Sequence, residues 1–140
     1  MSATWLVKSE PDVYSFDQLR TDGRTPWTGV RNAQARNNLQ AMRVGDRVLY
    51  YHSNEGKEIV GVAEVVAESY PDPTSPDDAR WVVVDLAPVA PLVAPVSLAR
   101  CKDDAVLRET ALVRQGRLSV MPITAEQYEQ ALALGGGLGA

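Results

Sequence analysis

Three short stretches of the chain combine aromatic and hydrogen-bonding side chains at the ends of predicted strands and helices. They are Lys8-Ser9-Glu10, residues 27–32 (WTGVRN) and Tyr51-His52-Ser53. Such groups together suit a flat heteroaromatic ligand. Stacking on an aromatic side chain contributes about 1–3 kcal/mol per base, and hydrogen bonds to the base edge discriminate between bases.

Hydrolytic and metal chemistry find little support in the sequence. His52 is the only histidine, and no group of Cys, His or carboxylate residues has the spacing of a metal site. His52 and Ser53 are adjacent in a predicted strand, so their side chains point to opposite faces and do not form a triad. The chain has neither a Gly-rich phosphate loop nor a nucleophile elbow. We therefore expect no catalytic residue, no metal and no cofactor.

Each candidate residue also has a purely structural interpretation, which the residues alone leave open. A tryptophan such as Trp27, placed before a helix, is more often a packing residue, and Asn32 is more often only the helix N-cap. Lys8 could pair with Glu10, and Arg31 could be solvated. From residue chemistry alone, a ligand pocket is one hypothesis beside these.

Composition and charge narrow the class of partner. The chain has 140 residues and a formal net charge of -4, which argues against a protein that coats nucleic acid by charge alone. Residues 1–57 carry eight basic and six acidic side chains, whereas residues 58–140 carry six basic and twelve acidic ones. A polyanion should therefore meet the N-terminal part first.

The same sequence indicates a protein of the cell interior. No apolar run approaches the roughly 18 residues that a membrane span needs, and the first residues lack the features of a signal peptide. Cys101 is the single cysteine, so no internal disulfide can form. We expect a cytoplasmic protein (nuclear in a eukaryote), monomeric and without membrane contact.

The pattern along the chain predicts an α+β domain of five or six strands. Strands are expected at residues 5–7, 47–53, 59–67, 80–87 and 117–120, and helices at 16–20, 33–42, 97–102, 105–114 and 125–134. Capping boxes are predicted at Ser15 with Gln18 and at Thr124 with Gln127, and Gly61 is expected to mark a bulge or a close backbone approach.

These elements do not alternate as βα units, and residues 54–57 (NEGK) indicate a hairpin. Prolines at 88, 91 and 95 predict that the segment containing them is extended or an edge strand. The pattern therefore predicts a small, mostly antiparallel β-barrel or strongly curved sheet with short surrounding helices. Residues 1–134 form one predicted domain, followed by a disordered Gly-rich tail at 135–140.

Several longer motifs resemble those of the EVE-domain family, which includes the thymocyte nuclear protein type. They occur in the family's order and extend over nearly the whole chain. The motifs are residues 5–11 (WLVKSEP), 27–39 (WTGVRNAQARNNL), 44–46 (VGD), 51–54 (YHSN), 61–65 (GVAEV), 70–74 (YPDPT) and 117–122 (RLSVMP).

The resemblance implies a PUA-like fold, related to the YTH domain, that reads a modified base without enzymatic activity. Methylated or hydroxymethylated cytosine in DNA is the implied ligand, with RNA as the other polymer. Trp27 becomes the candidate stacking wall, and Arg31 and Arg36 become candidates for backbone contacts. The full set of candidate ligand-binding residues is Lys8, Ser9, Glu10, Trp27, Val30, Arg31, Asn32, Tyr51, His52, Ser53, Arg117 and Ser119.

One departure from the family concerns residues 74–80 (TSPDDAR), which are short and contain no aromatic residue. If the longer segment of relatives closes the pocket, this chain has a more open one, with Trp81 or Tyr70 as a substitute.

Two rival functions use the same cavity differently. A sensor of free nucleosides would bind the mononucleoside as tightly as an oligonucleotide, and a protein-interaction module would bind no heteroaromatic ligand.

Overall fold

A computed structural model describes residues 3–140, which form a six-stranded sheet in the order β2-β5-β4-β3-β1-β6. The strands are β1 (Thr4–Ser9), β2 (Thr25–Pro26), β3 (Arg47–His52), β4 (Glu58–Pro71), β5 (Val82–Ser97) and β6 (Val120–Ile123). The helices are α1 (Phe16–Asp22), α2 (Ala33–Ala41), α3 (Leu98–Asp103), α4 (Ala111–Arg114) and α5 (Ala125–Leu134), with a 3-10 turn at Leu107–Glu109. Within these residues, no helix has the length and apolarity to cross a membrane.

The first strand lies inside the sheet because its apolar residues pack between two distant partners. β1 pairs in parallel with β3, which sets Ser9 beside His52, and antiparallel with β6. The parallel register brings the carboxyl ends of β1 and β3 together, as the sequence predicted if these strands were neighbours. The polar residues that follow both strands therefore share one edge of the molecule.

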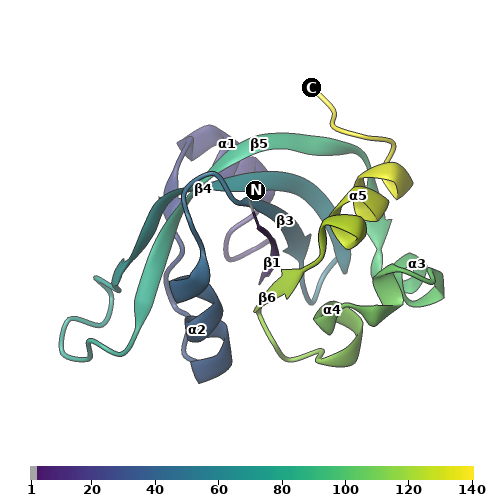
Figure 1. Cartoon of the computed structure of the whole chain (residues 1–140). Helices are drawn as coiled ribbons and strands as arrows, with labels where there is room; N and C mark the ends of the chain where they lie inside the picture. The colour runs from purple at the N-terminus through teal and green to yellow at the C-terminus, as the bar shows by residue number, and fades with distance from the viewer. Residues whose placement is uncertain (1–2) are drawn as a thin grey trace.

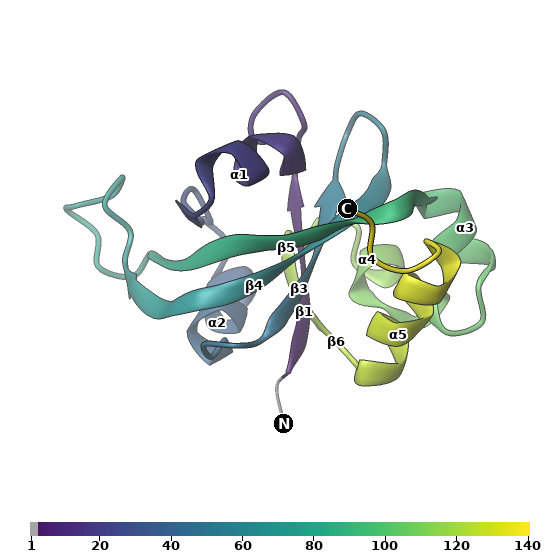
Figure 2. The same cartoon turned by 90° about the horizontal axis from the view of Figure 1, so that it is seen from above.

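The strands β4 and β5 form a long, curved antiparallel pair (Figure 2). The predicted irregularity at Gly61 is confirmed, because the β4–β5 register shifts between Ile59 and Gly61. The ring of Phe16 also covers this glycine, and a Cβ there would lie only 2.5 Å from its Cζ atom. The segment with Pro88, Pro91 and Pro95 is extended, as predicted, and belongs to β5. β2 pairs with only two residues of β5, so beyond them this side of β5 has no strand beside it among the described residues and is covered only by the C-terminal residues, through the bridge of Leu92 with Leu138.

The α+β class is confirmed, but the sheet is not closed into a barrel. β2 and β6 occupy its two edges and do not pair with each other in the described residues. The last strand also begins later than predicted. Residues 117–119 precede it, because the Leu118 amide donates to the Gln115 carbonyl (2.9 Å) and closes a turn there.

Local capping positions most of the helices. Thr124 and Gln127 form the complete capping box that the sequence predicted. Ser15 accepts from the Gln18 amide (3.0 Å), but the Gln18 side chain donates to Asp22 instead of returning to Ser15, so only half of that box exists. The helix predicted at 105–114 is divided into the 3-10 turn and α4 by Thr110, whose backbone is extended.

The Gly-rich tail differs from its expected disorder, because it runs along β5. Leu138 forms a β-bridge with Leu92, and the amides of Val93 and Ala94 donate to Gly137 (3.0 Å) and Gly135 (2.9 Å). Gly136 and Gly137 have positive φ angles of 75° and 86°, which glycine adopts at no steric cost. The glycine run therefore turns the chain back onto the sheet. In Figures 1 and 2 it lies near α5, at the end of the molecule where α3 and α4 also gather.

Candidate ligand-binding site

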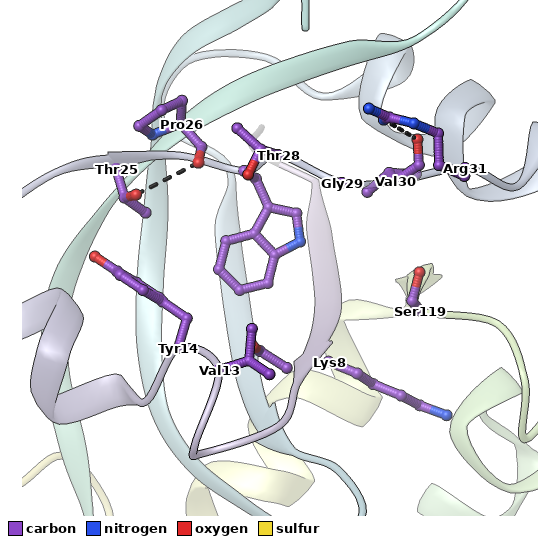
Figure 3. A pocket seen from close by; sticks show the side chains of 12 residues that line it. Lys8, Val13, Tyr14, Thr25, Pro26, Thr28, Gly29, Val30, Arg31 and Ser119 are labelled. Atoms are coloured by element: carbon purple, nitrogen blue, oxygen red, sulfur yellow. Dashed lines mark hydrogen bonds between the residues drawn. The ribbon is translucent and has the colours of Figure 1, made fainter. Parts of the chain in front are cut away.

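A cavity of about 340 Å³ opens at the carboxyl end of β1 and is lined by residues 8–9, 13–14, 25–31 and Ser119. Figure 3 shows Tyr14 and Thr25 on one side, Arg31 and Ser119 on the other, and Val13 and Lys8 below. The lining comes from four separate segments, which the sheet and the turn before α1 bring together.

Trp27 forms part of the cavity wall and is also part of the core. Its backbone amide donates to the Val84 carbonyl (2.8 Å), which ties it to β5. The indole meets the ring of Tyr50 edge-on at 5.4 Å and that of Tyr14 at 6.4 Å, and only 7% of the residue is exposed. The packing interpretation of Trp27 is therefore confirmed, and ligand contact stays a prediction that its place in the cavity lining allows.

Tyr50 and His52 hold the turn that carries Tyr14. The Tyr50 hydroxyl donates to the Tyr14 carbonyl (2.6 Å), and His52 Nε2 accepts from the Phe16 amide (3.1 Å) at the start of α1. Burial lowers the pKa of His52, against the opposing charges of Glu58 and Asp17, which suits the neutral acceptor that this bond requires. His52 thus supports the cavity without lining it.

Lys8 connects the cavity to the segment before β6. Its ammonium donates to the Gly116 carbonyl (2.7 Å) and lies 5.9 Å from the centre of the Tyr51 ring. Burial lowers the pKa of Lys8. Among the described residues Lys8 forms no ion pair with Glu10, because its side chain extends away from the turn at residues 10–14 (Figure 3).

Arg31 is fixed to the connection between β4 and β5 through the buried carboxylate of Asp72. That carboxylate accepts from Arg31 Nη1 (2.9 Å), the Gly29 amide (3.2 Å) and both the amide and hydroxyl of Thr74. Burial raises the pKa of Asp72, but these hydrogen bonds outweigh it and hold the pKa at about 2. The guanidinium also lies 5.6 Å from the centre of the Trp81 ring. The rim of the cavity is therefore a fixed structure.

Trp81 and Tyr70, the possible aromatic substitutes, lie outside the cavity lining. Trp81 is contacted by the guanidinium groups of Arg31, Arg36 and Arg80, and the Tyr70 hydroxyl donates to Asp85. Neither ring closes the cavity, since Trp81 is covered by arginines in the β4–β5 connection and Tyr70 is bound across β4 and β5.

A second hollow of about 320 Å³ adjoins this region and is lined by Asn32, Gln34, Gln115, Gly116, Arg117 and Leu118. Asn32 is the N-cap of α2, and its Oδ1 atom accepts from the Ala35 amide (2.9 Å). The expected capping role is thus confirmed, and the residue also faces a depression in the surface.

The structure brings together only part of the predicted set. The cavity includes Lys8, Ser9, Trp27, Val30, Arg31 and Ser119, and the second hollow includes Asn32 and Arg117. Glu10, Tyr51, His52 and Ser53 line neither. Glu10 accepts through its carbonyl in the turn before α1, and the Ser53 amide donates to the Ser9 carbonyl.

Six lining residues were missed by sequence reasoning: Val13, Tyr14, Thr25, Pro26, Thr28 and Gly29. Thr28 and Gly29 lie inside the WTGVRN motif, so they could have been predicted as lining residues together with their neighbours. Nothing local marks Val13 or Tyr14, because they reach the cavity through the β1–β3 pairing.

The arrangement suits binding better than covalent chemistry. The lining combines an aromatic wall with hydroxyls and contains no histidine or carboxylate side chain, and its volume falls in the range of roughly 300–1,000 Å³ typical of ligand sites. Residues 3–140 contain no cluster of three metal-ligating side chains. Cys101 is buried, and burial raises the pKa of its thiol to about 11, so it is a poor nucleophile.

Comparison with known proteins places these features in a family. The model of the EVE domain matches residues 3–134. Human Thymocyte nuclear protein 1 is 32% identical over 167 aligned residues, which cover 96% of this chain and 74% of that protein. Protein Atu2648 from Agrobacterium tumefaciens is 44% identical in its crystal structure, with a TM-score of 0.95 and coverage of 97% of this chain and 94% of that chain. Human THYN1, solved in complex with 5-methylcytosine-containing DNA, is 32% identical with a TM-score of 0.90, covering 96% and 98%.

Proposed function

The chain belongs to the EVE-domain family, and from this premise we propose that it binds DNA containing a methylated cytosine, with the modified base in the cavity beside Trp27. The observation that carries the proposal is the complex of human THYN1 with 5-methylcytosine-containing DNA, a structure that matches this chain over 96% of its length. The proposed activity is binding without catalysis. The curved, open sheet is then a PUA-like fold that presents the cavity at one end.

The cavity supplies the contacts that such a base requires. A base inside a duplex must be rotated out of the stack, which costs a few kcal/mol, and stacking on Trp27 returns about 1–3 kcal/mol. The hydroxyls of Ser9, Thr28 and Ser119 line the same space and offer hydrogen bonds to the polar edge of the base.

Recognition of the methyl group requires an apolar contact. Val13 and Val30 lie in the lining, and burial of one methyl group is worth about 0.8 kcal/mol, which corresponds to roughly a fourfold preference. With a net charge of -4, the protein gains little from phosphate attraction. Selectivity therefore depends on the cavity, and the polymer contributes modestly to affinity.

Titration of labelled duplexes that differ only in one cytosine tests the proposal. Plain, methylated and hydroxymethylated cytosine are compared, together with the matching RNA and the free nucleoside. We expect the wild type to prefer the methylated DNA and Trp27→Ala to lose that preference. Equal affinity of the wild type for all duplexes would overturn the proposal. A nucleoside bound as tightly as the duplex would favour the sensor instead.

Trp27 is part of the core, so a second variant keeps the test independent of folding. Val13 is 72% exposed at the cavity, and Val44, between α2 and β3, is 60% exposed elsewhere. Val13→Asp places a negative charge beside the bound strand and should weaken binding at least tenfold, whereas Val44→Asp should leave it unchanged. Equal effects of the two substitutions would exclude the cavity as the binding site.

A further inference from the structure

The cavity and the second hollow share both of their walls. One wall is the segment before and at the start of α2, where residues 28–31 line the cavity and Asn32 and Gln34 line the hollow. The other is the segment before β6, where Ser119 lines the cavity and residues 115–118 line the hollow. In Figure 1 the chain between α4 and β6 loops towards α2. The two depressions are thus consecutive parts of one groove.

We propose that the second hollow holds the nucleotide next to the modified cytosine and reads the edge of its base, with Arg117 as the main specificity residue. The proposal rests on the function proposed above and extends it from one base to a dinucleotide. A strand whose modified base enters the cavity has its next nucleotide one step away, and the shared walls lead to the hollow.

The side chains of the hollow are free to bind. Among residues 3–140, the side chains of Gln34, Gln115 and Arg117 make no hydrogen bond or ion pair within the protein, and Asn32 uses only its oxygen, for the cap. The lining includes no carboxylate that would repel a nucleic acid. Three amides and one guanidinium are therefore exposed and available to an external hydrogen-bonding partner.

The mixture of groups favours a base edge over a phosphate. A phosphate offers only acceptors, whereas amide side chains both donate and accept, as base edges do. Arginine pairs best with the N7 and O6 atoms of guanine, and glutamine pairs with adenine. The hollow should therefore prefer a purine beside the modified cytosine, and guanine if Arg117 makes the main contact.

The loop that carries these groups is held in place, which reduces the entropic cost of binding. The Lys8 ammonium and backbone amide donate to the carbonyls of Gly116 (2.7 Å) and Ser119 (2.9 Å). The Asn38 side chain donates from α2 to the Val120 carbonyl (2.7 Å). The loop before β6 is thus connected to β1, and α2 is connected to β6.

Binding is measured by fluorescence anisotropy with methylated duplexes that carry each of the four bases on either side of the modified cytosine. We expect the wild type to bind one purine-flanked duplex about tenfold tighter than its pyrimidine-flanked counterparts, a difference typical of one bidentate contact. Arg117→Ala should remove this flank preference and keep the preference for methylated over plain cytosine. Arg108→Ala, which removes an exposed arginine outside both depressions, is the matched control and should change neither.

The outcomes separate the two proposals. A wild type that distinguishes methylation but not the flanking base overturns the dinucleotide inference alone. The same holds if Arg117→Ala weakens all duplexes equally, because that result assigns Arg117 to the phosphate backbone. A wild type that does not distinguish methylated from plain cytosine overturns both proposals.

Discussion

Arg31 and Arg117 lie on the two walls of one groove, yet their surroundings are opposite. Arg31 is bound to the buried Asp72, donates to Thr74 and covers one face of Trp81. Arg117 is exposed, and within the described part of the chain its side chain has no hydrogen-bonding or ionic partner. Arg31 therefore holds the structure around the cavity, whereas the Arg117 side chain is unengaged within the described residues.

The largest expected effect is the loss of the carboxylate beneath Arg31. Asp72→Ala leaves the Gly29 and Thr74 amides without their acceptor and the guanidinium without its counter-charge. Loss of a buried acceptor leaves its donors unsatisfied, and because several donors share Asp72 we expect a loss of about 3 kcal/mol in the free energy of unfolding. Urea denaturation measures this loss. Asp77→Ala, in the exposed part of the same loop, should cost less than about 0.5 kcal/mol.

Acid should reproduce part of this loss in the unaltered protein. The pKa of Asp72 is about 2 in the folded state against its usual 3.8, so its charge contributes stability above pH 4. That contribution disappears as the pH falls towards 2, and the difference corresponds to about 2 kcal/mol. Urea denaturation of the wild type and Asp72→Asn at pH 5 and pH 2 should show that the difference between their free energies of unfolding becomes smaller at the lower pH. A difference that is the same at both pH values would contradict the lowered pKa of Asp72.

Arg31→Gln should have an intermediate effect. The substitution removes the charge but leaves Asp72 its donors from Gly29 and Thr74, and 38% of the Arg31 side chain is already exposed to solvent, which weakens the pair. We expect a loss of about 1.5 kcal/mol by thermal or urea denaturation. A cost indistinguishable from zero would place Arg31 in the same class as Arg117 and remove the contrast.

The smallest expected effect on stability is that of Arg117→Gln, the same chemical change on the opposite wall. An exposed side chain without partners should cost less than about 0.5 kcal/mol, although its removal changes binding. Denaturation of this variant beside Arg31→Gln makes the comparison direct. A loss above about 1 kcal/mol would indicate that Arg117 has a structural role after all.

The sequence predicted those features whose physical causes are local. Ser97, Asn32 and Thr124 cap helices through atoms three residues away, and the NEGK turn joins two antiparallel strands as expected. The irregularity at Gly61 could be predicted because a glycine inside a strand of β-branched residues indicates a bulge or a close backbone approach. Such signals lie within a few positions of the residues that they explain.

Contacts between residues that are distant in sequence could not be predicted from local patterns. Asp72 is 41 residues from Arg31, and the sequence contains nothing that joins the two. The same applies to Tyr14, which enters the cavity only because Tyr50 and His52 hold the turn before α1. The choice between a barrel and a strongly curved sheet depended on a contact between two edges, which no local pattern specifies. The contacts of the Gly-rich tail could not be predicted for a related reason. Its composition suggests disorder, but its bonds to β5, which is distant in sequence, hold it in place.

The position of β1 between β3 and β6 has a consequence for how the chain folds. Its residues 4–7 pair with residues 120–123 on one side and with residues 47–50 on the other. During synthesis, the first strand emerges with both neighbours still absent, and its second neighbour is far along the chain, since Thr4 and Ile123 are 119 residues apart. Contacts of such high sequence separation slow folding, so we expect nascent chains that lack β6 to leave one side of β1 unpaired and to depend on chaperones until the last strand arrives.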